Sequence, residues 1–354
     1  MTVVDPRPDE IVVRIVASGI CHTDILARDG IRPPRPPAVF GHEGAGIVEE
    51  VGRSVGGLVP GDRLVPGDRV VLSFASCGQC SACAAGNPAH CPAFPEHNYA
   101  GARPDGTPTL RTREGEVLAG SFFGQSSFAT HALVRARQAV RVPEDSDLGL
   151  LCPLGCAVQT GVGTVLNTLR PAPAEPVVVI GAGAVGLSAV MGTIIAGCRP
   201  IVVDVVPARL RLAAQLGAEQ VIDGGHGSIS DQITAAVGSG AKSIVDTTGD
   251  ARVLPDAVRA LAVGGSYAVV GAVAAGTTVP VDLQHLGRGR RLLGVVEGDS
   301  NPAEFIPRLV DFWRSGRLPL DRIVREYPMA EIDRAVSDML AGDVVKPVIR
   351  FGPS

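Results

Sequence analysis

The sequence predicts an α/β protein in which a helix-covered parallel sheet is inserted into a second, mostly β domain. Three stretches that differ in residue composition and pattern support this prediction. The first 150 residues hold short β-like runs separated by Pro and Gly, which suits an irregular β domain. From about residue 176, short apolar strands alternate with helix-like stretches, an order that requires a parallel sheet covered on both faces. After about Val296 the chain returns to mixed helix and strand, so the first domain is discontinuous.

Length and composition bound the class of protein. The 354 residues suffice for about two domains, and 45% hydrophobic with 19% charged residues excludes a disordered chain. A net charge of -4 offers no electrostatic footprint for nucleic acid. The first ten residues contain acids and lack the apolar stretch of a signal peptide. We therefore expect a cytoplasmic protein that binds neither nucleic acid nor membrane.

Each expected element follows from its residues. In the first domain, β-branched residues between turn residues predict strands over 11–16, 45–51, 69–73 and 130–134. In the second domain, the apolar strands are 177–180, 201–204, 220–222, 243–246 and 267–270. Beyond it we expect a helix over 302–315 and a terminal strand over 344–351. A Pro-Gly-Asp-Arg turn occurs twice, at 60–63 and 66–69, and indicates a local duplication that lengthens a loop.

Half of the eight cysteines fall within fifteen positions, which is typical of a metal or redox site in a reducing compartment. They are Cys77, Cys80, Cys83 and Cys91. Four thiolates on a glycine-containing loop suit tetrahedral zinc and leave no ligand position open, so we expect a structural zinc in loop 77–91. A redox pair would explain any two of these cysteines, and an iron–sulfur cluster all four. Ferredoxin spacing, however, places three residues before the fourth cysteine, and this chain has seven.

A second constellation is spread along the chain. Cys21 follows an expected strand, His42 begins a glycine-flanked turn, and two further cysteines, Cys152 and Cys156, lie far beyond them. Two Cys and one His with an open fourth position form a known catalytic zinc set, in which two thiolates cancel the charge of the metal. Asp24 is a candidate acceptor for the second ring proton of the histidine. Spacing leaves the two distant cysteines equal candidates, and a single buried cysteine is more often only a small apolar side chain.

A glycine-rich turn follows the strand over 177–180. Gly181, Gly183 and Gly186 fit the pattern G-x-G-x-x-G. Such glycines permit a tight turn, close approach of a pyrophosphate, and helix–strand packing. The uncharged stretch 176–198 is long enough to span a bilayer. Its β-branched start and its glycines predict a strand, a turn and a helix instead.

The acid that ends the next strand bears on the choice of cofactor. Asp204 lies 23 residues after the first glycine of the turn. A carboxylate there would hydrogen-bond the adenosine ribose diol and repel a 2′-phosphate, which favours NAD over NADP. Arg209, five residues further on, keeps NADP use open.

In combination, these motifs resemble the zinc-dependent branch of the medium-chain dehydrogenase/reductase family, and most closely its aryl-alcohol (benzyl alcohol) dehydrogenases. The resemblance covers nearly the whole chain and rests on GICHTD, GHEGAGIVEEVG, SFASCGQCSAC, FFGQSSFATHALV, LGCAVQTG and GAGAVG. It implies a GroES-like catalytic domain over 1–157 and 297–354, and a doubly wound Rossmann domain that binds NAD over 158–296. It also implies a homodimer or homotetramer, paired through the last strand of the nucleotide domain at about Arg291–Val296.

The resemblance also implies roles for individual residues. It places a catalytic zinc on Cys21, His42 and Cys156, and so favours Cys156 over Cys152 as the third ligand. With the structural zinc of loop 77–91, this gives two zinc ions per chain. Thr23 matches the hydroxyl that accepts the substrate's proton, and Glu43 an acid that transiently approaches the metal. Contacts with the cofactor are implied for His22 and Lys346 at the pyrophosphate, and for Thr160 and Val270 at the nicotinamide.

The implied reaction is the reversible NAD-linked oxidation of a primary aromatic or allylic alcohol to the aldehyde, by hydride transfer from a zinc-bound alkoxide. Candidates for an apolar substrate pocket are Phe74, Phe94, Phe122 and Phe123. Two alternatives stay open: a thiol-dependent formaldehyde dehydrogenase of the same branch, and a non-catalytic redox sensor that binds zinc and nucleotide. Two zinc ions per chain would fit an enzyme, and one would fit the sensor.

Three features depart from the family pattern. Leu26 stands where many relatives end the proton relay with a histidine, so the ribose hydroxyl, water or His22 must carry the proton outward. The N-terminus is shorter than usual by about two dozen residues, and we expect an opening strand to be missing and a sheet edge to be left unpaired. The third departure is the duplicated turn before the four-cysteine loop.

Overall fold

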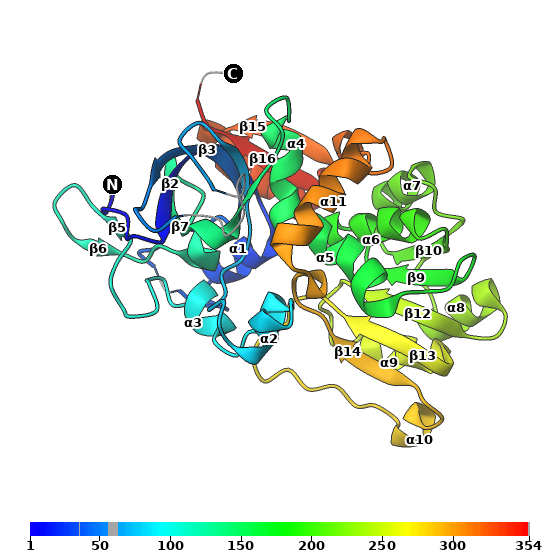
Figure 1. Cartoon of the computed structure of the whole chain (residues 1–354). Coiled ribbons are helices and arrows are strands. Elements are labelled where there is room, and N and C mark those ends of the chain that lie inside the picture. Colours follow the sequence, from blue (N-terminus) through cyan, green and yellow to red (C-terminus); the bar gives the residue numbers. More distant parts are fainter. Residues whose placement is uncertain (35, 56–62, 353–354) are drawn as a thin grey trace. The chain divides into compact units, whose positions relative to one another are not determined.

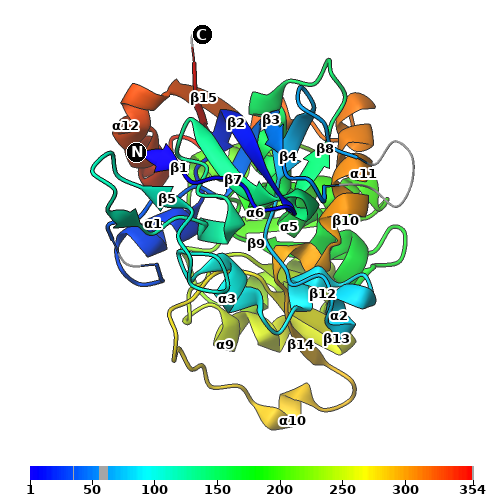
Figure 2. The same ribbon diagram turned by 60° about the vertical axis from the view of Figure 1, so that its left-hand side comes forward.

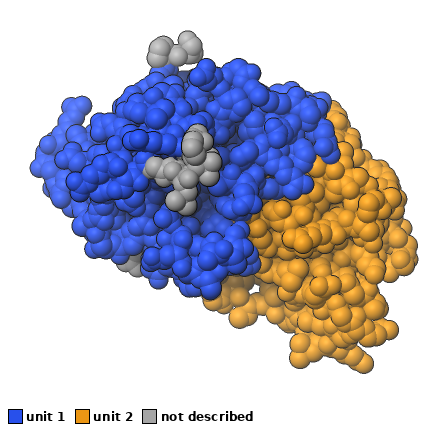
Figure 3. All heavy atoms as spheres, in the orientation of Figure 1, with its two compact units in different colours: residues 1–156, 301–354 blue, residues 157–300 orange. Residues whose placement is uncertain are grey.

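The computed structural model describes residues 1–34, 36–55 and 63–352. The chain forms two compact units, residues 1–156 with 301–354 and residues 157–300 (Figure 3). The sequence places these boundaries at 157/158 and 296/297, within a few residues of the observed division. Each unit has its own sheet and its own core.

The first unit is built on a seven-stranded sheet (Figure 2). Its strands in spatial order are β15 (Val324–Pro328), β16 (Lys346–Arg350), β2 (Glu10–Gly19), β3 (Glu43–Val51), β4 (Arg69–Leu72) and β8 (Ala139–Arg141), and β7 (His131–Arg135) also pairs with β2. The long strand β2 pairs with β3 along one edge, and with β7 and then β16 along the other. Because side chains alternate between the faces of a strand, Ile11, Val13 and Ile15 share one face and pack in the core with Val70 and Val134.

Short elements surround this sheet. A small sheet contains β1 (Thr2–Val3), β5 (Leu110–Arg111) and β6 (Val117–Leu118). The helices of the unit are α1 (His22–Arg28), α2 (Ser81–Ala84), α3 (Phe94–Asn98), α4 (Leu148–Leu151), α11 (Pro302–Arg314) and α12 (Ile332–Ala341). Short 3-10 helices lie at Pro88–His90, Phe122–Gly124, Ala136–Gln138, Cys152–Gly155, Leu320–Arg322 and Met329–Glu331. The four strands predicted for the first domain, and the helix and terminal strand predicted beyond residue 300, are all present.

The second unit is a six-stranded parallel sheet (Figure 1). Its spatial order is β11 (Gln220–Asp223), β10 (Arg199–Asp204), β9 (Pro176–Ile180), β12 (Ala241–Asp246), β13 (Leu261–Val269) and β14 (Arg291–Gly294). Its helices are α5 (Ala157–Gly163), α6 (Ala184–Ile195), α7 (Pro207–Gln215), α8 (Ile229–Val237), α9 (Leu254–Ala257) and α10 (Leu283–Leu286), with a π-helix at Thr164–Leu169 and 3-10 helices at Val258–Ala260 and Glu297–Asp299. Val178 and Ile180 face a core shared with Ile233 of α8, while α6 packs on the other face of the sheet. This doubly wound arrangement confirms the predicted fold class.

The uncharged stretch 176–198 forms β9 and α6, as its residue pattern predicts. Across the described parts of the chain, no single helix is long and apolar enough to cross a membrane; a bent pair, Leu148–Gly155 with Ala157–Leu169, meets the criteria of length and composition only when taken together. Of the duplicated turn, residues 60–62 lie outside the described residues. The second copy forms a tight turn before β4, in which Asp68 accepts a hydrogen bond from the Val65 N–H at 2.8 Å.

Candidate active site and metal centres

The four-cysteine loop gathers its sulfurs at one point. The ligand atoms of Cys77, Cys80, Cys83 and Cys91 all lie within 4.8 Å of one another. Backbone N–H groups turn toward them: the Cys80 N–H donates to Cys77 Sγ at 3.3 Å, and the Cys77 N–H to Cys91 Sγ at 3.5 Å. Four sulfurs with backbone donors around them are the ligand set of a structural zinc. Four protein ligands fill the tetrahedral coordination shell, so no position is left for a water molecule or a substrate.

The thiols of this loop differ in acidity. The backbone N–H of Gln79, followed by that of Cys80, lowers the pKa of Cys77 to about 6. Burial raises the pKa of Cys91 to about 12. A cation at the centre is therefore needed for all four sulfurs to be thiolates at neutral pH. Metal binding is thus coupled to deprotonation of the cysteines and to folding of the loop.

A second cluster joins three distant segments. The ligand atoms of Cys21, His42, Glu43 and Cys156 lie within 4.8 Å of one another. Cys21 follows β2, while His42 and Glu43 stand at the start of β3, and the antiparallel pairing of these strands sets Gly19 opposite Glu43. Cys156 ends the 3-10 helix Cys152–Gly155. The pairing of β2 with β3 and the position of the segment that ends at Cys156 together bring residues close that lie more than a hundred positions apart in the sequence.

The imidazole of His42 is held in one orientation. Its Nδ1 donates to Asp24 Oδ1 at 2.9 Å, and the same carboxylate accepts the N–H groups of Gly41 at 3.0 Å and Cys21 at 2.9 Å. Gly41 adopts φ +91°, and a Cβ there would lie 2.5 Å from the Phe128 nitrogen, so only glycine fits. The Nε2 atom of His42 is buried and has no hydrogen-bond partner among the described residues. A buried lone pair aimed into a cysteine-lined site fits a metal ion.

The charges of this site also suit a cation. Burial disfavours the imidazolium, but the Asp24 carboxylate outweighs burial and raises the pKa of His42 well above the usual range. The site therefore stabilises positive charge, which a metal ion would supply in place of the proton on Nε2. A hydrogen bond with the Cys156 thiol lowers the pKa of Cys21 well below the usual range, despite burial. Two thiolates, one imidazole and an open fourth position form the donor set of a catalytic zinc. The described residues therefore fit the ion that the sequence predicts.

The structure separates the two distant cysteines that spacing could not distinguish. The Cys152 thiol is fully buried and donates to the Gly149 carbonyl at 3.4 Å, and burial raises its pKa. It lies outside the group of candidate ligand atoms, which includes Cys156.

Residues of α1 border the same site. The Thr23 hydroxyl lies 3.7 Å from Cys21 Sγ, His22 is exposed, and Leu26 is half-buried. The buried carboxylate of Glu43 accepts hydrogen bonds from Lys346 Nζ at 2.9 and 3.0 Å. Sequence reasoning missed this pair, and a contact between Lys346 and a pyrophosphate stays a prediction. The chain contains only two lysines, and Lys346 is buried. Its burial would have indicated a buried acidic partner, but burial of a lysine cannot be predicted from the sequence.

Aromatic side chains form a wall beside His42. Phe123 stacks on the imidazole with ring centroids 4.5 Å apart, and Phe122 meets it edge-on at 5.5 Å. Tyr99 contacts Phe123 edge-on at 5.3 Å. All four phenylalanines proposed for a pocket are buried in one cluster, and only Phe122 and Phe123 of these are shown to contact His42.

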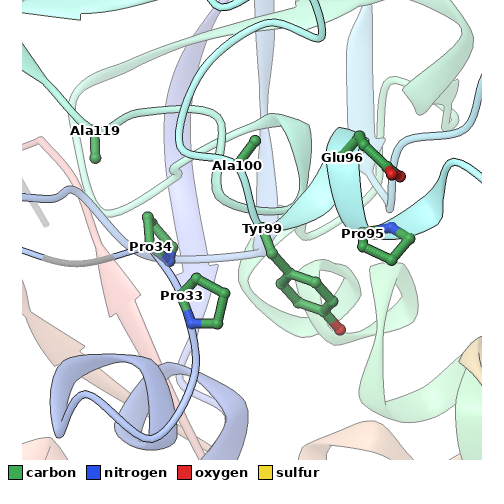
Figure 4. Close-up of a pocket in the computed structure, with 7 residues that line it drawn as sticks. All are labelled: Pro33, Pro34, Pro95, Glu96, Tyr99, Ala100 and Ala119. Carbon is green, nitrogen blue, oxygen red and sulfur yellow. The ribbon is translucent and has the colours of Figure 1, made fainter.

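Tyr99 also lines a surface hollow of about 530 Å3 (Figure 4). Its other lining residues are Pro33, Pro34, Pro95, Glu96, Ala100 and Ala119. Arg32 lies over the Tyr99 ring, 5.9 Å from its centroid. A mostly apolar hollow is thus joined to the imidazole of His42 by two successive aromatic contacts, through Tyr99 and Phe123.

The glycine turn of the second unit is shaped for a phosphate group. Gly181 has φ +91°, and a Cβ on Gly186 would lie 1.7 Å from the Gly181 carbonyl oxygen, so both positions require glycine. A Cβ placed on Gly183 would have no atom within 4 Å, so the backbone there is open to the approach of a pyrophosphate. Asp204 at the end of β10 accepts the backbone N–H groups of Ala182 and Val206. These residues fit a dinucleotide.

The remaining predicted cofactor residues lie in the same unit. Thr160 is buried on α5, and its hydroxyl lies 3.5 Å from a carboxylate oxygen of Glu297. Val270 directly follows β13. The buried Nε of Arg209 on α7 makes no hydrogen bond within the described ranges. Contacts of these residues with a cofactor stay predictions.

Comparison with known proteins places the chain in a family. Residues 7–144 match the alcohol dehydrogenase GroES-like domain, and residues 184–314 match the zinc-binding dehydrogenase domain. The chain is 42% identical over 350 residues to a geraniol dehydrogenase of Castellaniella defragrans, covering 98% of this chain and 92% of that protein.

Two solved structures are similar over nearly the full length. An alcohol dehydrogenase zinc-binding domain protein from Burkholderia ambifaria superposes with a TM-score of 0.94 at 44% identity, covering 99% of this chain and 94% of that one. A benzyl alcohol dehydrogenase from Acinetobacter calcoaceticus superposes with a TM-score of 0.91 at 41% identity, with the same coverage. Together with the two ligand clusters, these similarities show that the chain belongs to the zinc-dependent alcohol dehydrogenase family of NAD-dependent oxidoreductases.

Proposed function

We propose that the protein catalyses the reversible oxidation of a primary aromatic or allylic alcohol to the aldehyde, with NAD as the hydride acceptor. The observation that carries this proposal is the apolar hollow lined by Tyr99, whose ring contacts Phe123, which in turn stacks on His42. Aromatic rings offer a planar π-system an apolar surface and favourable ring contacts. The similarity to a geraniol dehydrogenase and to a benzyl alcohol dehydrogenase supports the same class of substrate.

Cys21, His42 and Cys156 would hold the catalytic zinc. When bound there, the ion supplies Lewis acidity that lowers the pKa of an alcohol. Asp24 fixes the histidine tautomer, because the Nδ1–H donates to the carboxylate and leaves the Nε2 lone pair directed into the site. The two cysteines supply the negative charge that balances the cation. The four cysteines of loop 77–91 would hold the second, structural zinc.

Thr23 would receive the proton of the alcohol. Its hydroxyl lies 3.7 Å from the Sγ atom of Cys21, which is one of the three proposed ligands. A hydroxyl can accept one proton while donating its own, so it serves as a relay. Leu26 has no group that can continue this relay, and the proton must leave through the ribose hydroxyl, water or the exposed His22.

The cofactor would lie along the carboxyl ends of the strands of the second unit, with its pyrophosphate at Gly181–Gly186 and its ribose at Asp204. The Asp204 carboxylate favours NAD, while Arg209, whose buried Nε makes no hydrogen bond to any residue that the structure describes, keeps NADP use open to test. Thr160 and Val270 would contact the nicotinamide. We further propose a cytoplasmic homodimer or homotetramer paired through β14, which is an edge strand of its sheet.

The test is to follow NADH absorbance with benzyl alcohol, geraniol and ethanol at saturating NAD, with zinc measured on the same sample. We expect turnover of the first two alcohols, at least about tenfold weaker turnover of ethanol because its binding buries far less apolar area, and two zinc ions per chain. Turnover of S-hydroxymethylglutathione alone would favour the formaldehyde dehydrogenase. A single zinc without turnover would contradict an enzymatic role and favour the sensor.

Replacement of the relay residue, Thr23→Ala, is expected to lower turnover about 100-fold or more, because proton transfer loses its acceptor. Thr23→Ser keeps the hydroxyl and should retain most activity. Zinc content should stay at two per chain in both variants. Unchanged turnover of Thr23→Ala would remove this residue from the proton path.

A further inference from the structure

A buried acid follows the last strand of the parallel sheet in the second unit. Glu297 lies three residues beyond the end of β14 and is buried. Its Oε2 atom accepts a hydrogen bond from Gln159 Nε2 at 3.0 Å, and the Thr160 hydroxyl lies 3.5 Å from the same atom. Gln159 and Thr160 both belong to α5, and both are neutral side chains. These two contacts therefore orient the carboxylate without cancelling its charge.

The turn that carries Glu297 is strained and firmly held. Glu297, Gly298 and Asp299 have φ values of +51°, +64° and +46°, so three successive residues adopt the left-handed conformation that side chains disfavour. Asn167 donates to the Gly298 carbonyl at 3.1 Å, and the Thr168 hydroxyl donates to Asp299 Oδ2 at 2.7 Å. Such strain persists only where surrounding contacts fix it, and it is concentrated at ligand-binding sites. The direction of the Glu297 side chain is thus set by its surroundings.

This turn lies at the edge of the sheet where the proposed cofactor binds. The Val295 N–H donates to the Val269 carbonyl at 3.0 Å, so the pairing of β13 with β14 continues toward Glu297. On α5, a Cβ on Gly161 would lie 2.2 Å from the Val185 carbonyl oxygen, so α5 touches the first turn of α6, directly after the glycine-rich turn. Ligands of open α/β sheets bind at the carboxyl ends of the strands. The Glu297 carboxylate therefore lies on the cofactor side of the sheet.

The nicotinamide changes its charge in the proposed reaction. A hydride, which is one proton with two electrons, leaves the carbinol carbon of the alcohol and forms a C–H bond at C4 of the ring, while the hydroxyl proton leaves separately. The ring is a pyridinium cation before this transfer and is neutral after it. A fixed negative charge nearby, away from water, therefore stabilises the oxidised ring more than the reduced ring. The adenosine half of the cofactor keeps its charge throughout.

We propose that Glu297 determines which oxidation state of the cofactor the protein prefers: its carboxylate, beside Thr160, favours NAD+ over NADH. The proposal rests on the proposed function, which places the nicotinamide at Thr160. Gln159 keeps the carboxylate in place, because the Ser300 hydroxyl donates to Gln159 Oε1 at 3.0 Å and so leaves Nε2 facing Glu297. Preference for the oxidised form suits oxidation of an alcohol, since NAD+ is retained and NADH is released more readily.

The test measures the binding of three ligands to the full-length protein loaded with zinc. NADH is titrated by its fluorescence, and NAD+ and ADP-ribose, which lacks the nicotinamide, are titrated by competition with NADH. Glu297→Gln has nearly the same shape and keeps an acceptor oxygen for Gln159. We expect it to weaken NAD+ relative to NADH by about tenfold or more, and to leave ADP-ribose within about threefold of the parent.

Two further variants separate the charge from the shape of the turn. Glu297→Asp keeps a carboxylate in the same turn and should retain most of the preference for NAD+. Asp299→Asn removes a charge two residues further on, where Thr168 holds the carboxylate, and is the matched control. Its ratio of NAD+ to NADH affinity should stay within about threefold of the parent.

The outcomes separate two failures. If the parent protein binds none of the three ligands, the proposed cofactor is wrong, and the role of Glu297 fails with it. If the parent binds them and a folded Glu297→Gln keeps the parent ratio, or weakens all three equally, the cofactor stands and the role of Glu297 is overturned. Should Glu297→Gln not fold, Glu297→Ala, which leaves space for water beside Gln159 and Thr160, takes its place with the same expected shift and the same overturning results.

Discussion

The two ligand clusters of this protein differ in how far apart in sequence their members lie. Cys77, Cys80, Cys83 and Cys91 occupy one stretch of fifteen residues, and backbone N–H groups of the same loop turn toward their sulfurs. The other cluster depends on the pairing of β2 with β3, on the segment that ends at Cys156, and on a carboxylate behind His42.

This difference shows what each cluster is suited to do. A local loop that uses all four of its ligands folds around its ion and has no position for a substrate. A cluster assembled by a sheet can leave one coordination position of the metal open. Its ligand atoms are held in place by neighbouring side chains, whereas those of the loop are held by the fourth ligand. Asp24, which accepts a hydrogen bond from His42 Nδ1, is such a side chain. The two sites should therefore respond separately to substitution, and their responses can be ordered by size.

The largest effect is expected from Cys156→Ala. Loss of one of three ligands should remove the metal of the open site, lower its content from two ions to one, and reduce turnover about 1000-fold or more. Cys152→Ala, four residues earlier, is the matched control and should keep both ions and most of the turnover. If Cys152→Ala loses the metal and Cys156→Ala keeps it, the assignment of Cys156 as the third ligand is wrong. Metal analysis and NADH absorbance are the measurements.

Asp24→Asn is expected to weaken metal binding at the open site by about 10- to 100-fold, because the amide orients His42 without the negative charge that strengthens it as a donor. Chelator competition measures this loss, and the ion of the four-cysteine loop serves as the internal reference. Asp29→Asn, at the other end of α1 and exposed, should change neither ion. Equal weakening at both sites would show that Asp24 acts through general stability.

Cys83→Ser should affect the other cluster. With a thiolate lost, the loop no longer closes around its ion, and cleavage by subtilisin within residues 77–91 should accelerate about tenfold, while the open site keeps its metal. Ser81→Ala in the same loop is the control and should be cleaved at the parent rate. Simultaneous loss of both ions would show that the two sites are not independent.

The smallest effect concerns the ion pair that anchors the start of β2, the strand that leads to Cys21. Arg103 donates to both oxygens of Glu10 at 2.7 Å, and both side chains are buried. Burial raises the pKa of Glu10, but the hydrogen bond from Arg103 leads the contributions that outweigh it and hold the pKa below 4.5. The folded state therefore binds this proton less readily than the unfolded state, so the stabilisation is present above about pH 4.5 and is lost as the pH falls.

Glu10→Gln should thus lower the free energy of unfolding by about 1 kcal/mol at pH 7, and the difference from the parent should shrink toward pH 4. Urea unfolding at pH 7, 5 and 4 measures it. A difference that stays constant with pH would show that the pair contributes by packing alone.

Periodicity predicted the parallel sheet and the main strands of the first unit, because each buries a face whose pattern is local. The short strands β1, β5, β6, β8 and β15 were not predicted, since two to five residues carry too little pattern. Spacing located the four-cysteine site and left Cys152 and Cys156 undecided, because only the fold determines which thiol points to His42. The pair of Lys346 and Glu43 could not be predicted, because 303 residues separate them and no local motif contains both.

The distance between these two residues has a consequence for how the protein is made. Synthesis proceeds at about 5–20 residues per second, so Lys346 leaves the ribosome roughly 15–60 s after Glu43. Over most of this interval Cys21, His42 and Glu43 have been made and the strand that restrains the carboxylate has not. The last pairing of β2, with β16, and the buried ion pair of Lys346 with Glu43 can therefore form only at the end of translation.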